Sequence, residues 1–204
     1  MKPRTKKLII VICAAAALAA AGFVLVPRIF SQGNVNSRYD PPKLTFEELP
    51  EAYIPLEKDE EYYTLNRDVF FSYAGTEVLL SDAFDGSGFN SAAKFFKDYF
   101  DTLKKADDLS LKEYYAEDYF EDNDYPEGYS PQRLYDIHAD FHSSGSVTLE
   151  GETYSVDNYV VKYKIRYNDG SFRKDLESDV WNPQLYQISL IGGEYRIVNV
   201  SYIK

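Results

Sequence analysis

The chain has 204 residues, which is enough for one domain plus attached segments. Aromatic residues make up 16% of it, and so much aromatic surface argues against a chain that is disordered throughout. The net charge of −11 argues against a nucleic-acid-binding protein that works through a broad basic face.

The N-terminus combines a basic tail with an uncharged apolar segment. Residues 1–7 hold four bases and no acid, and the 19 residues from Leu8 to Val26 carry no charge. A helix of that length reaches about 28 Å, close to the ~30 Å of a bilayer's hydrocarbon core. Basic residues remain on the cytoplasmic side. We therefore predict a single-pass cell-membrane protein with a transmembrane helix over 8–26, a cytoplasmic N-terminus and an extracytoplasmic C-terminal part.

A cleaved signal peptide is the alternative interpretation of the same segment. The small residues Ala19, Ala20 and Ala21 would suit a signal peptidase. The apolar run nevertheless continues through Phe23 to Val26, so we favour an uncleaved anchor. The only cysteine, Cys13, lies inside this segment, and the exported part must rely on an apolar core because it has no cysteine for a disulfide.

Residues 27–61 are predicted to form an extracytoplasmic tether, because they are rich in proline and acids and show no periodicity. Residues 62–90 are expected to hold a hairpin that leads into the domain. Two short β-branched and aromatic runs, at 69–73 and 77–80, flank the turn Ala74-Gly75-Thr76 there.

Three helices are predicted next. Ser91 is a candidate N-cap of the first, whose apolar residues recur every three or four positions from Phe95 to Leu103. A capping box over 110–113 predicts a second helix. Ser130-Pro131 predicts a third, because proline suits the first helical position.

Strands are predicted after Gly145, where the apolar period changes to two. Residues 161–167 alternate cleanly, with Lys162, Lys164 and Arg166 on the wet face. A hairpin turn is expected over 168–171, with residues 172–180 returning alongside. Gly192-Gly193 is expected to join the last two strands. The predicted fold is therefore α+β: a transmembrane helix, then three helices on a curved antiparallel sheet of four to five strands.

This order of elements resembles the nuclear transport factor 2-like superfamily, also called cystatin-like or SnoaL-like. The resemblance covers about residues 91–204. It is carried by the helix at 95–103, the turn at 168–170 and the ending Gly192-Gly193-Glu194-Tyr195-Arg196-Ile197. The superfamily includes isomerases, dehydratases, binding modules and scaffold domains, so the resemblance implies a fold and no single function. An anchor, tether and domain of this kind also resemble an assembly component of type IV secretion or conjugation machines.

Two histidines, His138 and His142, are the candidates for a ligand-binding or metal site. A spacing of four places both on one face of the predicted third helix, as a zinc site would need. No Glu of a metalloprotease signature accompanies them, so we expect no metal and no cofactor. Trp181, beside Asn182-Pro183, is a third candidate ligand-binding residue, because it could line the mouth of a pocket.

Five tyrosines form the predicted interaction patch. They cluster between the second and third predicted helices, and tyrosine is favoured at protein interfaces. These residues are Tyr114, Tyr115, Tyr119, Tyr125 and Tyr129.

No catalytic residue can be assigned, because the sequence shows no nucleophile elbow, phosphate loop or paired-cysteine motif. We expect a non-enzymatic, membrane-anchored binding or assembly module that contacts the membrane and another envelope protein, and no nucleic acid. The alternative is a small-molecule ligand-binding protein, or an isomerase- or dehydratase-like enzyme, that uses a pocket of the fold; its ligand cannot be named from the sequence.

Overall fold

The computed structural model describes residues 46, 55–81, 84 and 90–203, all of which belong to one compact unit, residues 38–204. The predicted tail at 1–7, the predicted transmembrane helix at 8–26 and most of the predicted tether at 27–61 lie outside the described residues. Among the described helices, none is long and apolar enough to cross a membrane.

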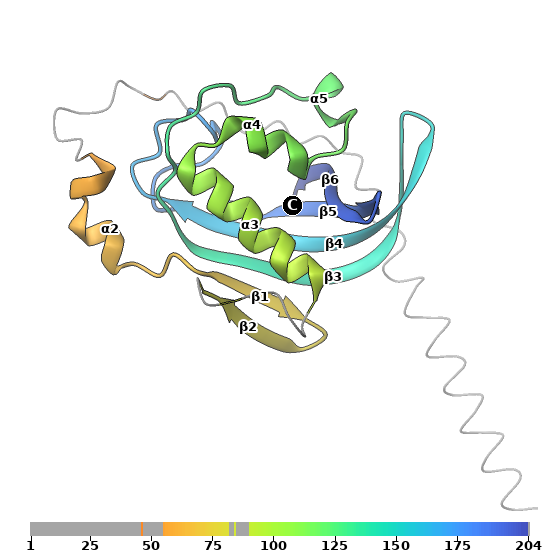
Figure 1. Ribbon diagram of the computed structural model, residues 1–204, viewed down its shortest axis with the longest axis horizontal. Helices are drawn as coiled ribbons and strands as arrows, with labels where there is room; N and C mark the ends of the chain where they lie inside the picture. The colour runs from red at the N-terminus through yellow and green to blue at the C-terminus, as the bar shows by residue number, and fades with distance from the viewer. Residues whose placement is uncertain (1–45, 47–54, 82–83, 85–89, 204) are drawn as a thin grey trace, which may run out of the picture. The chain divides into compact units, whose positions relative to one another are not determined.

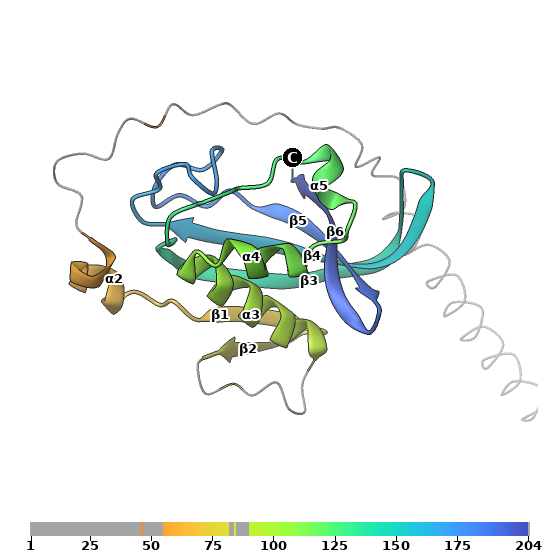
Figure 2. The same cartoon turned by 45° about the horizontal axis from the view of Figure 1, so that its top comes forward.

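The unit is built on one six-stranded mixed sheet with the order β2-β1-β3-β4-β5-β6 (Figure 1). Its strands are β1 (Val69–Tyr73), β2 (Thr76–Leu80), β3 (Leu134–Leu149), β4 (Glu152–Ile165), β5 (Gln184–Ile191) and β6 (Glu194–Tyr202). β1 pairs with β3 in parallel, and every other neighbouring pair is antiparallel. β3 and β4 extend well beyond the other strands as a long, curved hairpin (Figure 2).

The helices lie before the long hairpin in the sequence. They are the 3₁₀ helix η1 (Leu56–Lys58), α2 (Glu60–Thr64), α3 (Ser91–Lys105), α4 (Asp108–Leu111), the 3₁₀ helix η2 (Lys112–Tyr114) and α5 (Tyr119–Asp122). α3 alone among them exceeds two turns, and it covers one face of the sheet (Figure 2). The Asn90 side chain caps it by accepting a hydrogen bond from the Ala92 amide.

The core lies between α3 and the sheet. Phe96 and Phe100 are fully buried on α3 and meet rings from the strands. The Phe96 ring lies 4.9 Å from that of Tyr159, and the Phe100 ring lies 5.4 Å from that of Tyr163. The apolar stripe predicted over 95–103 is confirmed as the face of α3 that anchors it to the sheet.

The predicted fold class is wrong in its third helix. Residues 134–149 form β3, and the chain from Ser130 to Arg133 has no helical turn. The helix was predicted wrongly because β3 has an irregularity between Tyr135 and His138, where Asp136 has a φ of 48°. The extra residue at this bulge leaves both Leu134 and Ile137 buried, three positions apart, and so imitates helical spacing.

The predicted sheet is also wrong in its composition. It is mixed and has six strands, because the 69–80 hairpin joins it through the parallel β1–β3 pairing. Residues 168–180 form no hairpin. The Asn168 side chain donates to the carbonyls of Arg173 and Leu176, at 2.9 and 2.5 Å, and thereby holds residues 168–176 as a folded loop between β4 and β5.

Other local predictions are confirmed. The hairpin at 69–80 and the Gly192-Gly193 turn between β5 and β6 form as expected. The N-cap of the first helix was predicted one residue too late, because Asn90 is the N-cap and Ser91 is the first residue of α3. The second helix starts earlier than its capping box predicted. Asp107 caps it by accepting a hydrogen bond from the Ser110 amide, so the short α4 begins at Asp108.

The described end of the predicted tether is folded against the sheet. Asp59 is 1% exposed, caps α2 through the Tyr62 amide, and forms ion pairs with Arg133 and Arg166, each at 3.2 Å. Further back, the Phe46 ring lies so close to Gly170 that a β-carbon there would be 2.3 Å from it. Both contacts fix this part of the chain to the domain.

Candidate functional site

The register of β1 against β3 assembles the first part of the site. Phe70 is the register partner of His138, and the two rings stack with centroids 4.8 Å apart and planes 15° from parallel. Both residues sit in strands whose neighbouring positions, Phe71 and Ile137, are buried in the core. Alternation along a strand therefore turns Phe70 and His138 to the opposite face of the sheet from α3.

Trp181, from the loop between β4 and β5, completes the aromatic group. Its ring lies 6.0 Å from that of His138 at 88°, an edge-to-face arrangement. The indole Nε1 donates to the carbonyl of Asp136 over 3.3 Å, which fixes one edge of the ring. The side chain is nevertheless 42% exposed, so a large aromatic surface faces solvent.

Two lysines of β4 border the indole. The Nζ atoms of Lys162 and Lys164 lie 4.8 and 4.5 Å from the centroid of the Trp181 ring, within the range of cation–π attraction. Lys164 also donates to a carboxylate oxygen of Asp136 at 2.9 Å. We call this group of five residues the Trp181 cluster; it consists of Phe70, His138, Lys162, Lys164 and Trp181.

The electrostatics of the cluster keep its imidazole neutral near pH 7. Partial burial, followed by the positive charge of Lys162, lowers the pKa of His138 from its usual value of 6.5. The neutral imidazole, which stacks on Phe70 and meets the Trp181 ring edge to face, adds a weakly polar surface to this group. The cluster contains no activated nucleophile, so its chemistry is that of a binding surface with an aromatic centre and a cationic border.

The structure brings two of the three predicted ligand-binding residues together. His138 and Trp181 are in contact, whereas His142 is exposed at a second irregularity of β3, between Phe141 and Ser143. Across the described ranges, no group of three or more His, Cys, Asp or Glu residues could hold a metal ion. That the first two bind a ligand stays a prediction.

The predicted tyrosine patch lies partly inside the protein. Tyr129 is buried, and Tyr114, Tyr115, Tyr119 and Tyr125 are half-buried against the main core. The Tyr115 hydroxyl lies 2.9 Å from that of Tyr99 on α3, and either oxygen can be the donor. Much of this aromatic surface therefore packs inward, where it joins α3 to the segment between α4 and α5.

Sequence reasoning missed the buried polar group behind the patch. Tyr99, Tyr163 and Tyr186 come together with Arg173, whose Nε donates to the Asp175 carboxylate at 2.8 Å. Burial raises the pKa of Tyr99 well above its usual value. Burial would also raise the pKa of Asp175, but the hydrogen bond and charge of Arg173 outweigh this effect and lower it. These phenols are thus protonated at pH 7 and the carboxylate is a weak base.

Comparisons with protein-family models, curated proteins and solved structures found no match for this chain. The resemblance to the nuclear transport factor 2-like superfamily therefore gains no support from them.

A signal for part of the Trp181 cluster was present in the sequence. The alternation over 161–167 placed Lys162 and Lys164 on the wet face of a strand, and they are there. Phe70 gave no such signal. Its contact with His138 depends on the parallel β1–β3 pairing, which connects segments far apart in the chain.

Proposed function

We propose that the protein is a membrane-anchored, extracytoplasmic binding or assembly module that contacts another envelope protein through the Trp181 cluster. Its anchor would be Leu8–Val26, and the 33 acids against 18 bases beyond residue 26 give the exported part a net charge of −15. The observation that carries the proposal is the partly exposed indole of Trp181 at the centre of an ordered aromatic and cationic group.

Such a group is suited to contact with a partner, because its central ring is ordered and still partly exposed. Burying the rest of the indole would remove apolar surface from water, and the ring is already held by Asp136, so little side-chain entropy would be lost on binding. Tryptophan dominates the energetics of many protein interfaces for these reasons.

The enzyme alternative has weaker support. A proton-transfer enzyme needs a base with a pKa near its working pH, in reach of a substrate. Asp175 is a carboxylate whose charge acts on the buried phenol of Tyr163, and its ion pair with Arg173 makes it a poor base.

The proposal can be tested on the full-length protein purified from membranes in mild detergent. We expect Trp181→Ala to reduce the amount of a specific co-purifying envelope protein at least about tenfold. Leu109→Ala is the matched control, because Leu109 is an apolar side chain on α4 that is 82% exposed. Equal recovery of all co-purifying proteins from wild type and Trp181→Ala would contradict the proposal.

The anchor has a separate test. Protease added to intact cells should remove the C-terminal domain and spare a tag on the N-terminal tail. A domain that stayed protected would contradict the proposed orientation. A mature chain beginning near Gly22 would instead show a cleaved signal peptide and leave export standing.

A further inference from the structure

We propose that a second surface, distinct from the Trp181 cluster, binds an extended peptide segment of a partner that carries a Lys or Arg side chain between apolar residues. This surface is a groove formed by β4, β5 and β6 near the tip of the β3–β4 hairpin. We call it the hairpin groove and define it by Tyr154, Val156, Asp157, Leu190, Ile191 and Tyr195.

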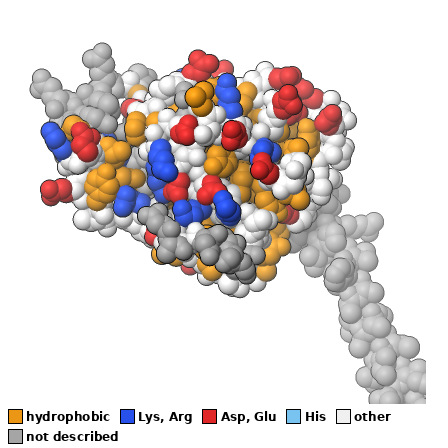
Figure 3. Space-filling view, viewed as in Figure 1, with side chains coloured by type: hydrophobic (Ala, Val, Ile, Leu, Met, Phe, Trp, Pro, Cys, Tyr) orange, Lys and Arg blue, Asp and Glu red, His pale blue; other side chains and the backbone are white. Residues whose placement is uncertain are grey.

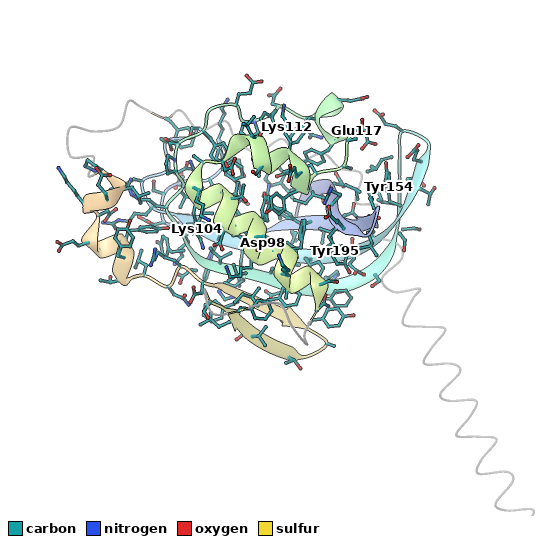
Figure 4. The ribbon with its side chains drawn as sticks, viewed as in Figure 1. Asp98, Lys104, Lys112, Glu117, Tyr154 and Tyr195 are labelled. Atoms are coloured by element: carbon teal, nitrogen blue, oxygen red, sulfur yellow. The ribbon has the colours of Figure 1, made fainter. Side chains whose placement is uncertain are left out.

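The hairpin groove is open to solvent and has a volume of about 430 Å³. Figure 4 shows Tyr154 and Tyr195 at this end of the sheet, with Glu117 from the segment before α5 on the same side. That size lies within the range of known ligand-binding clefts. An open cleft between strands is better suited to one part of a longer chain than to a small molecule that needs enclosure.

The groove has an apolar border. Leu190 is 61% exposed and Ile191 is 38% exposed, and they follow one another at the end of β5. The buried side chains of Val156 and Ile188 lie beneath them. Exposed aliphatic side chains that line a cleft are unfavourable in water, and covering them would stabilise a complex.

The polar part of the groove is negative. Asp157 lies in its wall and accepts hydrogen bonds from the hydroxyls of Ser144, at 2.6 Å, and Tyr195, at 3.4 Å. The Tyr154 hydroxyl donates to the carboxylates of Asp118 and Glu152, at 3.1 and 3.2 Å. All of these donors are hydroxyl groups, so none of them brings a positive charge to the carboxylates.

The residues around the groove add to its negative charge. Burial, followed by the charge and hydrogen bonds of Asp118 and Glu152, raises the pKa of Tyr154 to about 12. Arg196, at the start of β6, is already ion-paired with Glu194. Figure 3 shows acidic side chains over α5 and the tip of the hairpin, at the top and right of the view.

These features select the chemistry of the occupant. A negative wall would repel nucleic acid and other anions and attract a cationic side chain. The aliphatic border would cover apolar side chains on either side of that cation. A peptide that alternates the two kinds of residue satisfies both, because alternate side chains of an extended chain point in opposite directions.

The test uses the full-length protein in detergent and a short fluorescein-labelled peptide of alternating leucine and lysine as the probe. We expect an increase in fluorescence anisotropy on binding, a weaker affinity at higher salt, and no binding of a matched leucine–glutamate peptide. Asp157→Asn, which keeps the shape of the side chain, should weaken binding at least about tenfold. Leu190→Ser should also weaken it, and because Leu190 is exposed this variant should fold normally.

The controls separate this inference from the proposed function. Asp140→Asn removes a carboxylate of β3 from outside the groove and should leave the affinity unchanged, as should Trp181→Ala. Failure of the lysine peptide to bind, equal binding of the glutamate peptide, or unchanged affinity in both Asp157→Asn and Leu190→Ser would each overturn the inference.

Discussion

At the scale of single residues, Asp59 shows how one side chain can join distant parts of the chain. Its carboxylate caps α2 and meets Arg133 just before β3 and Arg166 just after β4. With Asp59 1% and the Arg133 side chain 2% exposed, this is a buried ion pair. Such a pair adds little net stability over an apolar replacement, but removing one partner leaves a buried charge without compensation.

We therefore expect Asp59→Ala to lower the free energy of unfolding by about 3–5 kcal/mol, measured by urea denaturation. The matched control is Glu61→Gln, because the Glu61 side chain also contacts Arg166 but is 72% exposed. Its effect should be below about 1 kcal/mol. Similar losses in the two variants would show that burial does not set the strength of these interactions.

His138 gives the protein a defined response to acid. Its pKa is lowered in the folded protein, so the unfolded chain binds the proton more tightly. Stability should be intact above pH 6.5 and should decrease as the pH falls through that value toward the folded pKa. In His138→Gln this component should be absent, so urea denaturation between pH 7 and pH 5 should show a smaller loss than in the wild type. An equal loss of stability in the wild type and in His138→Gln would contradict this role of His138.

At the scale of elements, the sequence was informative wherever the signal was local. The stripe of α3, the 69–80 hairpin and the Gly192-Gly193 turn each depend on residues close together in the chain, and each was predicted. The first part of β3, before Gly145, was predicted to be a helix because the bulge at Asp136 changes the spacing of its buried residues. The folded loop at 168–176 was missed because side-chain bonds of Asn168, which have no periodic pattern, hold it together.

The same distinction applies to the Trp181 cluster. Strand alternation predicted that Lys162 and Lys164 face solvent. Trp181 was a candidate ligand-binding residue because it stands beside Asn182-Pro183. The contact between Trp181 and His138 could not be predicted, because it requires both the bulged β3 and the 168–176 loop. The stacking of Phe70 on His138 requires a strand pairing between distant segments, for which a single sequence holds no local signal.

Gly170 links the loop to the segment that precedes the sheet. Gly170→Ala should lower the free energy of unfolding by about 2–4 kcal/mol, because φ is +73° and the added carbon would meet the Phe46 ring. Gly128→Ala is the control: φ is +63° and nothing lies within 4 Å, so only about 1–2 kcal/mol should be lost.

Adding Phe46→Ala to each glycine variant completes the test by chemical denaturation. The double variant with Gly170→Ala should lose less than the two single effects added together, because the clash is gone. Additive losses would show that Phe46 does not limit the space at Gly170.

At the scale of the whole molecule, the unit begins well before the first long helix. β1 lies between β2 and β3, and its side chains Val69 and Phe71 are buried in the main core. Asp59 and Tyr62 tie the preceding helix to β3, the latter through a hydrogen bond of 3.1 Å to the Leu134 carbonyl. The stable unit should therefore include these residues.

Truncation tests this boundary. A chain that begins at Pro55 should unfold in one cooperative transition, followed by circular dichroism in urea. A chain that begins at Ser91 should lose that transition, because an edge of β3 and the core face under β1 become exposed. A cooperative transition of similar midpoint in the shorter chain would show that β1 and β2 are dispensable.

The parallel pairing of β1 with β3 also sets the order in which the chain can fold. The β3–β4 and β5–β6 hairpins close over tight turns and need only neighbouring residues, so they form quickly. Val69 must wait for Ile137, a contact across a long intervening segment that is entropically costly to close. During synthesis β1 leaves the ribosome early and finds its partner late. Its apolar side chains thus remain uncovered for the longest time, and β1 is the part of the domain most exposed to aggregation or to capture by a chaperone.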